Sequence, residues 1–125
     1  MPMTPFVLIQ NLDIPFPQPL RIKYCDSFLC RLRGLTFRRK LAPTEGLLLV
    51  QKQDSRLDAS IHMLGVSFDL AVIWINSSLR VVDKVLAKSW HLAYAPQKGA
   101  KYILEIHPGR WGDFEIGNQI EIKNV

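Results

Sequence analysis

Apolar and polar residues alternate over several short stretches of the chain, and this spacing predicts strands. In residues 20–24, Leu20, Ile22 and Tyr24 fall on one face and the two basic residues between them on the other, as in a half-buried strand. Residues 101–106 and 120–123 have the same two-residue period, and in the former Ile103 and Glu105 share the second face. Continuous apolar runs predict strands at 46–50 and 70–75, residues 79–86 return from a turn at 76–78, and 59–63 is a further candidate strand.

One short helix is predicted between the first strands. Asp26 or Ser27 can cap its N-terminus, apolar residues follow at helical spacing, and Gly34 suits the position after its end. Residues 1–19 are expected to be an irregular, Pro-rich segment, residues 51–58 a polar loop, and residues 108–114 a loop or helical turn. About seven short strands and one short N-terminal helix predict a mainly β fold, either a small two-sheet sandwich or a partly closed barrel, because stacking or closure protects strand edges.

Length and composition indicate one domain with an ordinary core. The chain has 125 residues, of which 48% are hydrophobic and 22% charged, and this balance argues against disorder. No apolar run has the length of a membrane span, and the first twenty residues do not have the pattern of a signal peptide. We therefore expect a soluble, cytoplasmic protein, with export of a longer precursor as the alternative.

The net charge of +5 is concentrated in one stretch. Seven basic residues and one acid give residues 21–40 a net charge of +6, so the rest of the chain is close to neutral. Such a stretch can bind an anion, or it can be a solvated face that favours solubility. Nucleic acid is not favoured, because the stretch contains no known nucleic-acid-binding motif.

The two cysteines, Cys25 and Cys30, do not form a metal-binding pattern, since a zinc site needs four ligands in short-spaced pairs. Five residues apart on one short element, they would point in different directions, which predicts two buried thiols rather than a disulfide.

Residues 27–34 (Ser-Phe-Leu-Cys-Arg-Leu-Arg-Gly), with Leu35, Phe37, Arg38 and Arg39 after them, resemble the Arg-rich opening of domain-of-unknown-function family 192, which is found mostly in bacteria and archaea. The resemblance continues in order over roughly residues 20–123, through segments 45–49, 60–62, 68–75, 81–82, 95–96, 99–105 and 116–118. It implies a mainly β fold of two sheets. It implies no activity and no cofactor, because none is established for the family.

The chain departs from that family pattern at an acid. The family's Asp falls on Ala71 and its Pro on Asp69. Positions 69 and 71 share a strand face about 7 Å apart, so Asp69 is either a displaced substitute or an unrelated surface acid. A metal role loses its hard oxygen ligands through this change, and no metal is expected.

Two kinds of chemistry remain open for the polar residues. His62 with Asp69 is a weak candidate for a hydrolase- or lyase-like pair; Ser60 would lie about 7 Å from His62 on one strand face, and no nucleophile elbow is present. The three histidines lack metal-ligand spacing. Loop aromatics Trp90 and Tyr94 could stack on a sugar or another flat ligand.

The favoured hypothesis is a non-enzymatic binding or accessory domain. The guanidinium groups of arginine suit carboxylate or phosphate. A small anion-binding groove would form if the loops at 60–63 and 94–96 close over the arginines. The candidate ligand-binding residues are Arg33, Arg38, Arg39, Ser60, His62 and Tyr94. The alternative is structural, with an arginine paired to Glu105 or Asp69. The expected partner is a small anionic or sugar-like ligand, or a protein.

Overall fold

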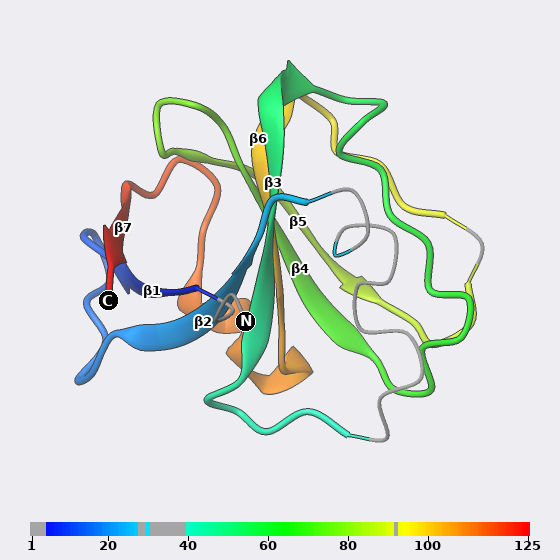
Figure 1. Cartoon of the computed structure of the whole chain (residues 1–125), viewed down its shortest axis with the longest axis horizontal. Coiled ribbons are helices and arrows are strands. Elements are labelled where there is room, and N and C mark those ends of the chain that lie inside the picture. The colour runs from blue at the N-terminus through cyan, green and yellow to red at the C-terminus, as the bar shows by residue number, and fades with distance from the viewer. Residues whose placement is uncertain (1–4, 28–29, 31–39, 92) are drawn as a thin grey trace.

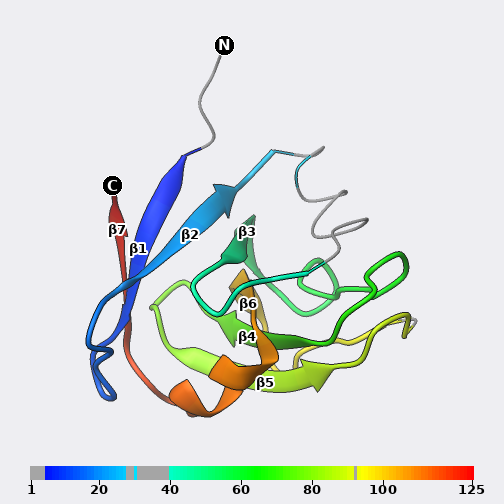
Figure 2. The same cartoon turned by 90° about the horizontal axis from the view of Figure 1, so that it is seen from below.

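Seven strands form one sheet that curls into a half-barrel (Figures 1 and 2). The computed structural model describes residues 5–27, 30, 40–91 and 93–125. The elements are β1 (Phe6–Asn11), β2 (Leu20–Cys25), β3 (Gly46–Ser55), β4 (Leu70–Ile75), β5 (Val81–Ala87), β6 (Ala100–Ile106), a 3-10 helix η1 (Pro108–Asp113) and β7 (Ile120–Asn124). The strand order is β5-β4-β6-β3-β2-β1-β7, and the β2–β3 pair is parallel whereas the other pairs are antiparallel.

The two edges of this sheet meet at one corner. Arg80 and Gln119 form an isolated antiparallel bridge between the start of β5 and the start of β7. The Val81 amide donates to the Asn118 carbonyl at 3.0 Å, and the Gly117 amide donates to the Val81 carbonyl at 2.8 Å. The fold-class prediction is therefore confirmed in its barrel form: the sheet is single and partly closed.

The sheet buries apolar residues on both faces. The first cluster receives residues from all seven strands, including Ile9, Ile22, Leu48, Ile73, Val81, Leu104 and Ile120. The second cluster lies on the other face of the middle strands and includes Leu47, Leu49, Val72, Trp74 and Ile103. Because β4 is buried on both faces, its sequence is a continuous apolar run rather than an alternating one. The second face of residues 101–106 is covered in the same way, since Ile103 and Glu105 are buried.

Three predicted boundaries need correction. The segment 1–19 is not irregular throughout, because β1 pairs with both β2 and β7 and buries Val7, Ile9 and Asn11. The polar residues 51–55 continue β3 instead of forming a loop. Residues 59–63 are not a strand; within them only Ile61 makes a bridge, to Tyr94. The helical turn expected at 108–114 is confirmed as η1.

The predicted helix after β2 lies mostly outside the described residues, but its start is visible. The Ser27 hydroxyl accepts a hydrogen bond from the Cys30 amide at 3.2 Å, as expected of an N-cap. The prediction of two free thiols is wrong, because Cys25 and Cys30 form a disulfide. Cys25 ends β2 and Cys30 is helical, so the two residues do not share an element, and their Cα atoms are 5.7 Å apart.

Candidate functional site

Two segments that are distant in sequence lie side by side over the second cluster, at the right of Figures 1 and 2. We call them the paired loops: residues 59–66 and residues 88–94, apart from Leu92. Ile61 and Tyr94 exchange backbone hydrogen bonds of 2.9 and 2.8 Å. The Met63 amide donates to the His91 carbonyl at 2.9 Å, and the Met63 carbonyl accepts from the Trp90 amide at 3.0 Å. The paired loops therefore form a short hydrogen-bonded layer outside the sheet.

Apolar side chains fasten this layer to the sheet. Ala59, Ile61 and Met63 are buried in the second cluster, and Tyr94 packs against it. The indole nitrogen of Trp74 on β4 donates to the Ala59 carbonyl at 2.8 Å. Every second residue of 59–63 is thus directed into the core, which leaves Ser60 and His62 between the anchors. This alternation is the pattern that suggested a strand.

The predicted ligand-binding residues fall into two groups. Ser60 is half-buried and its hydroxyl donates to the Arg56 carbonyl at 3.1 Å, whereas His62 is exposed. The Tyr94 hydroxyl accepts from the Lys88 amide at 2.9 Å. The structure therefore brings Ser60, His62 and Tyr94 onto the paired loops. Arg33, Arg38 and Arg39 lie outside the described residues.

The residues on either side of segment 31–40, which we call the basic segment, are nevertheless described. Cys30, just before it, is tied to Cys25 by the disulfide and packs against the second cluster. Leu41, just after it, is buried in the same cluster. Both residues that flank the basic segment therefore lie at the apolar cluster that the paired loops cover.

Asp69 contacts the second paired loop. One carboxylate oxygen accepts from the Ser89 amide at 2.9 Å, and the other lies 3.5 Å from the Lys88 ammonium. The backbone hydrogen bond, followed by the charge of Lys88, lowers the pKa of Asp69. Among the described residues no hydrogen bond joins His62 to Asp69. Asp69 precedes β4 and holds the start of the second paired loop, while Ala71 lies in the first cluster.

Glu105 is the polar residue whose burial is hardest to predict from the sequence. It lies on β6 between Leu47 of β3 and Val72 of β4, and it is 5% exposed. Loss of hydration raises the pKa of its carboxyl group to about 7. Alternation in β6 assigns Glu105 to a polar face, and its burial becomes visible only once the second layer is known. From the sequence, Glu105 was predicted only as a possible partner of an arginine.

Among the described residues, no group of three or more His, Cys, Asp and Glu side chains could hold a metal ion. The histidines occupy separate positions: His62 and His91 lie on the paired loops, and the His107 ring nitrogen accepts from the Gly109 amide at the start of η1. In the part of the chain that the structure describes, no helix has both the length and the apolarity to cross a bilayer.

Comparison with known proteins identifies relatives that match most of this chain. The family model DUF192, described as an uncharacterized ACR, matches residues 11–123. The UPF0127 protein of Thermococcus kodakarensis is 44% identical over 85 residues, which cover 68% of this chain and 52% of that protein. The UPF0127 protein of Pyrococcus furiosus is 36% identical over 104 residues, which cover 82% of this chain and 86% of that protein. This chain thus spans about half the length of the Thermococcus kodakarensis protein.

Two solved structures share the fold. A putative transcription regulator from Sinorhizobium meliloti superposes with a TM-score of 0.79 at 17% identity, over 96% of this chain and 94% of that chain. A protein of unknown function from Novosphingobium aromaticivorans superposes with a TM-score of 0.76 at 19% identity, over 93% of this chain and 83% of that chain. At these identities the similarity concerns the fold alone.

Proposed function

Because this chain belongs to the DUF192 family of uncharacterized proteins, its function must be inferred from the site, and we propose that it is a non-enzymatic domain that binds a small anionic ligand at the paired loops. Arg33, Arg38 and Arg39 supply the charge in this proposal, and Ser60, His62 and Tyr94 form the neighbouring surface. The ligand class is a carboxylate or phosphate, because guanidinium groups bind both through two parallel hydrogen bonds.

One observation carries the proposal. The pairing of Ile61 with Tyr94 brings together the two loops that were predicted to border the site. They cover the same apolar cluster at which the basic segment begins, at Cys30, and ends, at Leu41. In this proposal the arginines of the intervening segment bind the ligand at the paired loops, since both flanking residues lie at the cluster that these loops cover.

Binding is favoured over catalysis by the environment of the acids. Asp69 is engaged by Ser89 and Lys88, so it does not orient His62 as a general base. Glu105 is buried among apolar side chains. Among the described residues no hydrogen bond pairs His62 with Asp69, and this supports recognition of an anion over catalysis by these two residues.

A thermal-shift panel tests the proposal. Phosphate, sulfate, citrate and short dicarboxylates are compared with neutral sugars, at low and at moderate salt. A ligand at about 100 times its Kd adds roughly 2.7 kcal/mol to the free energy of unfolding, which for this chain length raises Tm by several degrees. We expect one class of anion to stabilise the protein. Neutral sugars should stabilise it less.

Matched variants locate the effect. Arg33→Ala and Arg38→Ala should remove most of the stabilisation, and His62→Ala should leave most of it. Lys123→Ala on β7 removes the same charge from an exposed side chain far along the sheet and serves as the control. Equal losses in Lys123→Ala and Arg33→Ala would mean a general charge effect. Binding of long polyanions with a steep salt dependence, in place of small anions, would indicate the nucleic-acid alternative.

A further inference from the structure

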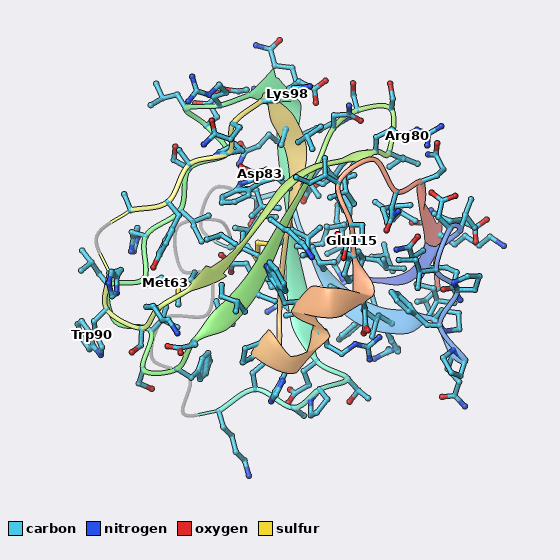
Figure 3. All side chains as sticks on the ribbon, turned by 180° about the vertical axis from the view of Figure 1, so that it is seen from behind. Met63, Arg80, Asp83, Trp90, Lys98 and Glu115 are labelled. Atoms are coloured by element: carbon cyan, nitrogen blue, oxygen red, sulfur yellow. A yellow bond between two sulfur atoms is a disulfide. The ribbon has the colours of Figure 1, made fainter. Side chains whose placement is uncertain are left out.

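Trp90 is the exposed aromatic residue of the paired loops. Its side chain is 61% exposed and projects away from the body of the protein at the edge of the molecule (Figure 3). The other two tryptophans differ, since Trp74 is buried and Trp111 is partly buried against the first cluster. Exposure of a single apolar residue is common in proteins and has no meaning by itself.

The backbone of Trp90 supplies the second observation. Its φ angle is 63°, in the left-handed region that bulky residues rarely adopt. A residue held there costs the fold on the order of 1 kcal/mol or more. Glycine would adopt this conformation without that cost, and the exposed Trp90 side chain adds little to the core.

Hydrogen bonds around Trp90 hold this turn in one conformation. The Trp90 amide donates to the Met63 carbonyl at 3.0 Å, and Met63 itself is fully buried. On the preceding side, the Ser89 amide donates to Asp69 at 2.9 Å and the Lys88 amide donates to the Tyr94 hydroxyl at 2.9 Å. The indole ring therefore extends from a backbone that is held at several points.

The surroundings of the ring are polar. His62 and His91 are exposed on the same paired loops, and the Lys88 ammonium lies close to the turn. Leu64 follows Met63, whose carbonyl accepts from the Trp90 amide, and its side chain is partly exposed. Trp90 and Leu64 are the large exposed apolar residues described on the paired loops, and two such residues are fewer than a stable protein interface needs. An exposed ring with polar neighbours suits a small ligand better than a broad apolar partner.

We propose that Trp90 is a preformed stacking platform and that the ligand of the paired loops is therefore an anion that carries a ring with an apolar or aromatic face. The inference rests on the proposed function, which supplies the anion. The ring is a pyranose or a nucleobase, and both present a face to the indole.

Three phosphates distinguish these possibilities: inorganic phosphate, glucose 6-phosphate and adenosine monophosphate. Their Kd values are measured for the wild-type protein and for Trp90→Ala, Trp90→Phe and Trp90→Gly. We expect at least one ring-bearing phosphate to bind about fivefold or more tightly than inorganic phosphate, as expected for one stacked ring. The sugar and nucleotide arms identify which ring it is.

The variants separate stacking from strain. Trp90→Ala and Trp90→Gly should both lose the advantage of the ring while their Kd for inorganic phosphate stays unchanged, and Trp90→Phe should retain most of it. Glycine relieves the left-handed backbone, so equal losses in the two small variants exclude strain as the cause. Leu57→Ala, at an 83% exposed residue on a different turn, is the control for loss of exposed apolar surface.

Different failures have different meanings. If inorganic phosphate binds but the ring gives no advantage, the platform is wrong and the anion site stands. If Trp90→Ala weakens all three phosphates equally, Trp90 has a structural role and the inference is overturned. Binding of none of the three contradicts the proposed function itself. Loss of sedimentation with phosphatidylglycerol vesicles in Trp90→Ala, with the three Kd values unchanged, would assign the residue to a lipid surface and overturn the inference.

Discussion

At the scale of single residues, Glu105 shows how burial changes the chemistry of a carboxyl group. Its neighbours across β3 and β4 are Leu47 and Val72, and the raised pKa of about 7 follows from the loss of hydration. The folded protein therefore holds this proton at pH values where the unfolded chain, with a pKa near 4.5, has released it. A carboxyl group with a raised pKa stabilises the fold below the unfolded pKa, and this contribution is lost as the pH rises through about 7.

Glu105→Gln tests that sign. The amide does not titrate, so the free energy of unfolding of the variant should gain on that of the wild type between pH 5 and pH 8, by an amount on the order of 3 kcal/mol. Urea unfolding at several pH values measures it, with Glu121→Gln on β7 as the control. If instead the wild type loses stability relative to the variant on acidification, Glu105 is an ionised partner of an arginine, as the structural alternative from the sequence supposed.

Sequence alone identified which residues have reactive groups but not their environments. Ser60, His62 and Tyr94 were chosen as neighbours of one site, and they do lie on the paired loops. Asp69 was left as either a substitute acid or a surface acid, and its bonds to Ser89 and Lys88 depend on a loop twenty residues away. Contacts of this range follow from the return path of the chain after β5, which local spacing does not specify.

At the scale of elements, periodicity predicted the strands with the strongest patterns and missed those where the pattern is weak. β2, β4 and β6 were correctly predicted, because alternation or a continuous apolar run marks each. β1 was obscured by the prolines that follow it, although its own residues alternate between buried and half-buried. The polar end of β3 lacks an apolar face, so its pairing with β6 at Ser55 could not be predicted from hydrophobicity.

The disulfide after β2 gives a prediction at this scale. A closed loop of this size contributes about 2 kcal/mol to the free energy of unfolding in the chain-entropy model. Reduction should therefore lower Tm by several degrees, and it should also weaken the anion binding, because Cys30 fixes one end of the basic segment. Calorimetry with and without reductant measures the first effect. The Cys25→Ala/Cys30→Ala variant should start from the lower Tm and be insensitive to reductant; a reductant effect in that variant would show another cause.

At the scale of the whole molecule, the curled sheet determines where a ligand can bind. Its inner face is filled by residues from all seven strands. In the described part of the chain, its outer face is covered over the middle strands by the paired loops, Cys30 and Leu41. Barrel closure was predictable from the number of short strands, but the parallel β2–β3 pair was not, because local spacing does not specify the relative direction of two strands.

The most direct test of the anion site is a ¹⁵N-resolved NMR titration with citrate or phosphate, whichever stabilises the protein more in the thermal-shift panel. The account predicts that the amides of Ile61, His62, Met63 and Tyr94 shift together with a single Kd, while those of β1 and β7 stay in place. Shifts that centre on β7 and η1, or that spread evenly over the exposed amides, would contradict a ligand site at the paired loops.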